Sequence, residues 1–298
     1  MRISAKTSDR IFVFFNTLLM LFVIVVMLYP FLNTLAVSFN NATDSLKGGI
    51  FLWPRKFTTG NYKSIFENPL LFTAFKNSIL RTVISTVLGL FFCSMAAYVI
   101  SRAEFLLNKF VTIYFLMTMY VTAGLFPMYF LYRGLGLINN FNVYWIPGLF
   151  SAFNIIIIRT YMQGLPDSLV EAARIDGAGE FRTFIQIILP ICKPVLATVG
   201  LWIAVGNWND WFTTFIYAPT DNLTTLQYEL MKRLATAMAQ MAKQQAEFLA
   251  ASSGTFDNVT PVAIRATITI VAAVPILCVY PFLQKYFVKG VHVGSVKG

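Results

Sequence analysis

Long apolar runs dominate this chain and determine how the rest of it is interpreted. Six runs contain no lysine, arginine, aspartate or glutamate, and they cover residues 11–43, 82–101, 110–132, 134–158, 194–209 and 266–284. A helix needs about 20 apolar residues to cross a bilayer. Four runs reach that length alone, the fifth extends past Asp210 to Phe215, and the sixth gains a turn from residues 262–264. The pattern predicts six transmembrane helices.

These predicted helices define the fold class, an all-α polytopic membrane protein. We place the spans at about 11–39, 71–101, 110–132, 139–161, 191–216 and 262–284. The longer connecting segments are then 40–70, 163–190 and 217–261. Composition agrees, because 57% of the residues are hydrophobic and only 12% are charged, about half the charged share of an ordinary globular protein. A soluble globular domain is excluded.

The N-terminus has the charge pattern of a signal peptide but not its length. Arg2, Lys6 and Arg10 precede the first apolar run, which is longer than the roughly 7–15 residues of a signal-peptide core. We expect this run to remain as the first span, kinked at Pro30. The net charge of +10 suits a membrane surface, and the chain contains no nucleic-acid-binding motif.

A charged segment, EAARIDGAGEFRTFIQIILP, lies between the fourth and fifth predicted spans. Ser168 and Glu171 have the spacing of a capping box, which predicts a short helix from about Ser168 through Ile175. Gly177 and Gly179 permit the positive φ of a sharp turn. We therefore expect a folded helix and turn here, rather than an extended loop.

A second helix should follow that turn. Apolar residues recur at helical spacing, which predicts one apolar face; they are Phe181, Phe184, Ile185 and Ile188. Pro190 is expected to end this helix, because proline lacks the backbone donor that a helix interior requires. Such a helix-turn-helix can simply pack against its own neighbours, and physical reasoning alone leaves that alternative open.

The spacing of the fixed residues in this segment carries a specific resemblance. Glu171-Ala172-Ala173, three residues, Gly177, nine residues, Ile187, one residue and Leu189-Pro190 resemble the EAA loop of bacterial ABC-importer permeases, which have the MetI-like fold. The chain looks like the carbohydrate branch, in particular the smaller permease subunit akin to that of the maltose importer. The resemblance implies that segment 163–190 couples to an ATPase through Glu171, Ala172, Ala173, Asp176, Gly177, Phe181, Leu189 and Pro190.

The resemblance also implies a set of partners and an orientation. It predicts a second homologous permease in a heterodimer, two ATPase subunits that bind ATP and Mg, an extracytoplasmic solute-binding protein, and residence in the bacterial cytoplasmic membrane. Both termini would be cytoplasmic, and the tail residues Gly294, Ser295 and Lys297 would contact the ATPases. Charge alone does not orient the chain, since the predicted inner and outer segments hold 12 and 11 basic residues.

The fifth span contains the most polar cluster of any span, at Asn207, Trp208, Asn209, Asp210 and Trp211. A carboxylate at membrane depth is costly, about 2.5–3.5 kcal/mol at a helix centre, so it tends to face a cavity or a partner. An interfacial aromatic belt is the alternative. We assign the cluster to the translocation path or a gate. Asn77 is a further candidate, whereas its basic neighbours Lys76 and Arg81 are expected to extend to the interface.

The outer segments are expected to bind partners outside the membrane. Leu226–Leu249 is rich in good helix formers, which predicts an exposed helix that contacts the binding protein, and Trp53 and Tyr62 should lie at headgroup level. The outer segments carry 11 basic and 7 acidic residues. That excess of positive charge would attract an anionic glycan such as a uronate oligomer. Lipid headgroups or an acidic binding protein are the alternative partners for these charges.

Catalytic and metal-binding chemistry is not indicated. No phosphate-binding loop motif occurs, so ATP hydrolysis must belong to another chain and this chain holds no cofactor of its own. Three cysteines and one histidine give no metal-site spacing. The open alternatives are an ion-coupled secondary transporter, an ABC permease for a non-sugar solute, and a membrane receptor or scaffold.

Overall fold

The computed structural model describes residues 7–45, 47–250 and 260–294. Its regular structure there is helical, apart from one isolated antiparallel bridge between Asn40 and Phe57. Within the described residues, three helices are long and apolar enough to span a membrane, and the number rises to six if each of three bent helix pairs counts as one span. The expected class, a polytopic α-helical membrane protein, is confirmed.

The chain divides into two compact units, of which the first comprises Met1–Asn68 and Lys232–Val274. It contains α1 (Thr7–Ser38), α2 (Ala42–Ser45) and α3 (Gly60–Phe66). The turn after α1 is held by Asn61, whose amide donates to the carbonyl oxygens of Ser38 and Asn40 at 2.9 and 2.8 Å. The Tyr62 hydroxyl is hydrogen-bonded to the Ser38 hydroxyl at 2.8 Å.

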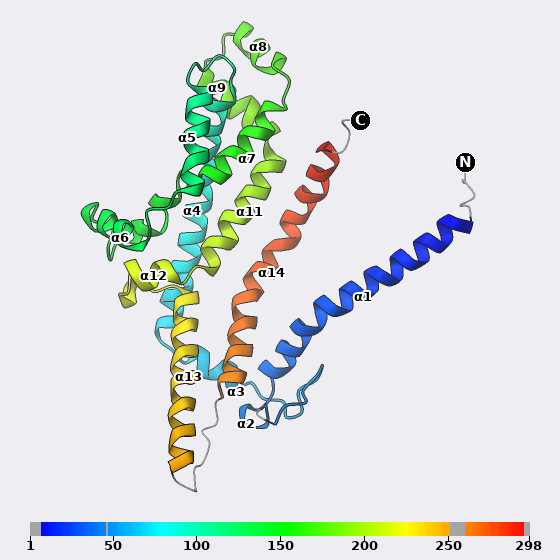
Figure 1. The fold of residues 1–298 in the computed structure, drawn as a ribbon, viewed down its shortest axis with the longest axis vertical. Helices are drawn as coiled ribbons and strands as arrows, with labels where there is room; N and C mark the ends of the chain where they lie inside the picture. The colour runs from blue at the N-terminus through cyan, green and yellow to red at the C-terminus, as the bar shows by residue number, and fades with distance from the viewer. Residues whose placement is uncertain (1–6, 46, 251–259, 295–298) are drawn as a thin grey trace. The chain divides into compact units, whose positions relative to one another are not determined.

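The second unit, Pro69–Met231 with Pro275–Gly298, is organised around a helical bundle. Its members are α4 (Leu70–Ser101), α5 (Asn108–Tyr120), α7 (Ala152–Gln163) and α11 (Lys193–Asn209), which run side by side (Figure 1). Gly200 allows the close approach of α11 to α4, since a Cβ atom there would lie 2.9 Å from Leu90 Cδ1. Fully buried residues of the bundle core include Cys93, Ala97, Ile155, Ile158 and Val199.

Two breaks interrupt this bundle in the middle of predicted spans. The helix α5 ends at Tyr120, and α6 (Leu125–Gly134) leaves it at 117°. Gly124 has φ +83° at this break, a backbone conformation that glycine adopts readily. The second break lies between the 3₁₀ turns η1 (Phe141–Tyr144) and η2 (Ile146–Gly148) and the start of α7, with a bend of 43°.

The fifth predicted span is also discontinuous. Its main helix α11 ends at Asn209, and α12 (Phe212–Tyr217) follows after Asp210 and Trp211. The turn η4 (Asp221–Leu223) then leads to α13 (Leu226–Ala250), close to the predicted helix at Leu226–Leu249.

The last helix, α14 (Pro261–Gly294), continues through Gly290. Helical hydrogen bonding tolerates an occasional glycine at a cost of about 1 kcal/mol.

Candidate functional site: the coupling loop

The segment 163–190, which we call the coupling loop, begins with a helix that ends in a glycine turn. The helix α8 spans Ser168–Ile175, as predicted. Gly177 has φ +75°, and its N–H donates to the Arg174 carbonyl at 3.0 Å while that of Ala178 donates to the Ala173 carbonyl at 2.9 Å. This pair of bonds is a Schellman motif with glycine at the left-handed position, which explains why Gly177 is needed.

Two predicted details of the loop are wrong. The Ser168–Glu171 capping box does not form; instead, the Glu171 N–H donates to the backbone carbonyl of Asp167 at 3.1 Å, and the N-cap side chain makes no hydrogen bond. Gly179 has φ −70° rather than a positive value. One left-handed residue therefore reverses the chain, and Gly179 serves only as the extended residue that precedes α9 (Glu180–Thr183).

The helix α8 has one buried and one exposed side. Val170 and Ala173 are 4% exposed and pack inward, whereas the exposed residues of the loop include Glu171, Ala172, Ile175, Asp176 and Phe181. We call these five residues the coupling face. Ile175 is 87% exposed and Phe181 is 63% exposed. Large apolar side chains at the surface of a charged loop are typical of a protein interface.

An ion-pair network attaches α8 to the end of the bundle where α4 meets the α4–α5 turn. The Arg174 guanidinium donates two hydrogen bonds of 2.5 Å to the Glu104 carboxylate and further bonds of 3.2 and 2.8 Å to Glu180 Oε1. The Tyr98 hydroxyl at the end of α4 donates to Glu180 Oε2 at 2.8 Å. Bidentate pairing fixes orientation as well as distance, so α8, α9, α4 and the turn after α4 are held in one arrangement.

The charges in this network are stabilised by their neighbours. The hydrogen bonds from Arg174 lower the pKa of Glu104. The pKa of Glu180 is lowered by the hydrogen bond from Tyr98 and then by those from Arg174. The two carboxylates in turn raise the pKa of Arg174. Sequence reasoning missed Glu104 and Tyr98, since they lie some 70 residues before the motif and only folding brings them to it.

The second half of the loop differs from the prediction at Pro190. A π-helical turn, Phe184–Ile188, connects α9 to α10 (Leu189–Ile191), and Pro190 lies inside this continuous path. The bend comes later, with 83° between Glu180–Ile191 and α11. Pro190 is the second residue of α10, and it follows directly on the π-helical turn, so it does not end the helix as predicted. Of the predicted apolar face, Phe184 and Ile188 are buried, but Phe181 and Ile185 are exposed.

The candidate path residues occupy several different environments. Asn77 is buried, and its amide donates to the carbonyl oxygens of Asn222 and Thr224 at 2.9 Å each. Trp208 is also buried, with its ring 6.1 Å from that of Phe75. Asn209 is exposed and accepts a hydrogen bond from Gln227 at 3.2 Å. Trp211 is half-buried beside α12, 5.9 Å from the Phe215 ring.

Arg81 contacts the remaining two path residues, Asp210 and Asn207. The expectation that it extends to the membrane interface is wrong. It is 3% exposed, forms an ion pair with Asp210, and donates to Asn207 Oδ1 at 3.3 Å. Its guanidinium lies 4.7 Å from the Tyr144 ring centroid. Among the predicted tail contacts, Gly294 is the last residue of α14, and Ser295 and Lys297 lie outside the described residues.

The broken helical spans and the exposed, charged loop between them are features of a membrane transport subunit. The family described as "Binding-protein-dependent transport system inner membrane component" matches residues 140–293, and the chain belongs to it. It is thus an inner-membrane component and permease of an ABC importer, not an enzyme, and it works with an ATPase and a binding protein.

Individual relatives extend over nearly the whole chain. It is 34% identical over 293 residues to Protein LplC of Bacillus subtilis (98% of this chain, 96% of that protein). It is 30% identical over 280 residues to the Polygalacturonan/rhamnogalacturonan transport system permease protein YtcP of the same organism (94% and 96%). A solved chain of a bacterial ABC transporter involved in the import of the acidic polysaccharide alginate superposes with a TM-score of 0.79 at 27% identity, covering 96% of this chain and 99% of that one.

Proposed function

We propose that this chain is one of two homologous permease subunits of an ATP-driven oligosaccharide importer, and that its coupling loop docks on a separate ATPase. The coupling face carries this proposal. It presents exposed Ile175 and Phe181 together with Glu171 and Asp176, on the helices α8 and α9, which the Arg174 network holds together. Docking of the ATPase there would bury the exposed apolar surface of the coupling face. ATP-driven closure of the ATPases would then move the coupling loop, which is rigidly attached to the bundle.

The remaining parts of the assembly follow from this docking. The coupling loop lies between the fourth and fifth of six spans, so an even number of crossings separates it from each terminus. Both termini would then lie in the cytoplasm, on the same side of the membrane as the loop. The tail residues Gly294, Ser295 and Lys297 then reach the ATPase pair, which binds ATP and Mg. The first four turns of α13 carry exposed Met231 and Met238, a surface suited to the solute-binding protein.

The proposed substrates are acidic oligosaccharides, such as oligomers of uronic acids. Support comes from two similar proteins, the permease named for polygalacturonan and rhamnogalacturonan and the transporter involved in alginate import. The predicted excess of basic residues on the outer segments agrees with an anionic substrate. We place Asn207, Asn209, Asp210 and Trp211 at a gate on the path, because Asp210 and Asn207 are bonded to Arg81 at the break between α11 and α12.

The test is transport by the assembled complex in proteoliposomes, with the binding protein on the outer side. We expect uronate oligosaccharides to enter with ATP and to stimulate ATP hydrolysis. Stimulation by neutral sugars alone would remove the acidic substrate class, and stimulation by no sugar would remove the carbohydrate assignment. Replacing Ile175 by glutamate should lower copurification of the ATPase, whereas Leu106→Glu, at an exposed leucine of the α4–α5 turn, should not.

A further inference from the structure

Residues 47–57, which follow α2, fold back beside the last turns of α1, and we call them the return segment. The Asn33 side-chain amide in α1 donates to the carbonyl oxygens of Ile50 and Phe51 at 2.6 and 3.0 Å. Asn33 lies five residues before Ser38, where α1 ends, which is about 7.5 Å along the helix axis. The return segment therefore lies beside a helix long and apolar enough to cross a membrane, and not beyond its end.

The backbone of the return segment is hydrogen-bonded within the protein although it is irregular. The Arg55 guanidinium donates to the Gly48 carbonyl. At Lys56, the N–H donates to Asn40 Oδ1 at 2.7 Å, and the carbonyl accepts a bond of 2.8 Å from the Asn41 N–H. Backbone groups without a partner are costly where water is absent. The bonds of this segment therefore fit a stretch of chain that enters the membrane interface.

A groove of about 380 Å³ lies between the return segment and α1. Its walls are built from aliphatic and aromatic side chains, which include Leu32, Leu35, Leu52, Trp53 and Phe57. Trp53 and Phe57 are 82% and 70% exposed, so their rings are accessible from outside the protein. Tryptophan is enriched where a membrane meets water, because its ring is apolar and its N–H is polar. An apolar groove with an exposed tryptophan in its wall is therefore typical of the membrane interface.

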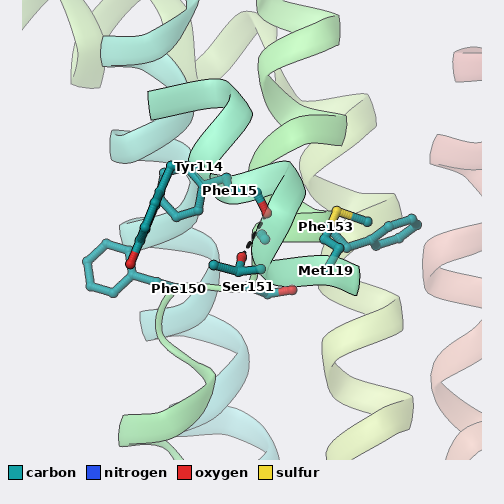
Figure 2. Close-up of a pocket in the computed structure, with 8 residues that line it drawn as sticks. Tyr114, Phe115, Met119, Phe150, Ser151 and Phe153 are labelled. Atoms are coloured by element: carbon teal, nitrogen blue, oxygen red, sulfur yellow. Dashed lines mark hydrogen bonds between the residues drawn. The ribbon is translucent and has the colours of Figure 1, made fainter. Parts of the chain in front are cut away.

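A cavity in the second unit provides a contrast in wall chemistry. Figure 2 shows the Ser151 hydroxyl among the rings of Tyr114, Phe150 and Phe153. The described residues that line the groove beside α1 carry no hydroxyl, amide or charged side chain, and their one polar group is the indole N–H of Trp53. A polar ligand would lose its hydrogen bonds to water in this groove without replacement. The groove therefore suits a hydrocarbon chain.

Positive charge is concentrated in the return segment itself. It contains Lys47, Arg55 and Lys56, and the acidic residue that precedes it is Asp44. Asp44 is 4% exposed, and its Oδ2 lies 3.4 Å from Arg55 Nε, so its charge is paired inside the protein. Lys47 and Lys56 are exposed. The surface next to the groove therefore offers two lysines to an anion.

We propose that the groove and these two lysines form a binding site for an anionic phospholipid, with an acyl chain in the groove and the phosphate near the lysines. The charge favours lipid over a transmembrane helix of another subunit, because carboxylates that could pair with the lysines are rare within spans. A water-soluble partner would not reach a groove that lies alongside a span. The site also places Trp53 at headgroup level, the position that the sequence predicts for it.

The first experiment determines what surrounds the return segment. A spin label is attached to Leu52→Cys in a Cys278→Ser background, which removes the exposed native cysteine, and the assembled transporter is placed in vesicles of equal parts phosphatidylglycerol and phosphatidylcholine. Relaxation of the label is measured with oxygen, which concentrates in lipid, and with a nickel chelate, which stays in water. We expect the Leu52→Cys label to respond to oxygen and not to the chelate. The matched control is Lys63→Cys on α3, whose side chain is 78% exposed and whose label should respond to the chelate.

The second experiment compares lipid headgroups at Trp53. Emission of Trp53 is obtained as the difference between the wild-type complex and Trp53→Phe, and lipids brominated on the acyl chain quench it on contact. We expect brominated phosphatidylglycerol to quench Trp53 more strongly than brominated phosphatidylcholine at the same mole fraction. Lys47→Gln and Lys56→Gln should each lower the preference for phosphatidylglycerol about fivefold, whereas Lys63→Gln should leave it unchanged.

Three results would overturn the lipid site. A strong response of the Leu52→Cys label to the nickel chelate would place the return segment in water. A weak response to both reagents would show that another protein covers the groove. Equal quenching of Trp53 by the two brominated lipids would show that the lysines do not select an anionic headgroup.

Discussion

Arg81 of α4 and Asp210, the residue that follows α11, form an ion pair at the point where the fifth span breaks. Arg81 also donates to the Asp210 backbone carbonyl at 2.8 Å. Asp210 accepts a hydrogen bond of 3.1 Å from the Thr213 N–H in α12. One guanidinium group of α4 therefore fixes the end of α11, and its carboxylate partner fixes the start of α12.

We predict that removing one partner of this pair is more damaging than removing both. Arg81→Met leaves the Asp210 carboxylate without its counter-ion, a change that typically costs about 3–5 kcal/mol for a buried pair. The double variant Arg81→Met/Asp210→Leu should recover part of that loss. The measurement is the thermal unfolding midpoint of the purified complex, with Arg133→Met, at an exposed arginine of α6, as the control. A double variant less stable than Arg81→Met would contradict the prediction.

The second prediction concerns the left-handed glycine of the coupling loop. A Cβ atom at Gly177 would meet no atom within 4 Å, so the cost of substitution lies in the backbone, about 1–2 kcal/mol for an ordinary residue at positive φ. We expect Gly177→Ala to weaken ATPase copurification and Gly177→Val to weaken it further, with Gly177→Asn close to wild type. Gly179→Ala is the matched control, because Gly179 has negative φ and open space. Equal effects at the two glycines would refute this account.

The third prediction separates assembly from coupling. Glu104→Gln removes the charge that Arg174 contacts in the α4–α5 turn but leaves the coupling face intact. We expect ATP hydrolysis to continue at its basal rate while its stimulation by the loaded binding protein falls severalfold. Glu67→Gln, at an exposed glutamate of unit one, should leave stimulation unchanged. Restoration by Glu104→Asp would identify the role as positioning, and full stimulation in Glu104→Gln would exclude it.

The fourth prediction is a pH dependence with a definite sign. The pKa values of Glu104 and Glu180 lie below their ordinary value of 4.5 in the folded protein. Their contribution to stability is therefore complete above about pH 4.5 and is lost as the pH falls through the folded-state values. We expect the stability difference between wild type and Arg174→Gln to be constant near neutral pH and to shrink below pH 4.5. A stability difference between wild type and Arg174→Gln that grows on acidification would contradict the prediction.

The sequence was sufficient for the parts of the fold that depend on local pattern. The apolar runs predicted the positions of α1, α4 and α14, and the glycine at position 177 predicted the loop turn. The break before α7 was not predicted, because Pro147 and Gly148 lie inside a continuous apolar run and hydropathy alone does not show where a span bends. The Arg81–Asp210 pair and the Glu104–Arg174 pair were missed because each joins positions 70 or more residues apart.

The bent spans have a consequence for how the protein enters the bilayer during synthesis. At about 1.5 Å per residue, the 13 residues of α5 and the 10 of α6 extend about 20 and 15 Å, and each is too short for a hydrocarbon core of about 30 Å. Neither half can be released into lipid as a finished span. We therefore expect this region to become stable in the bilayer only when α7, which packs against α5, has also been made.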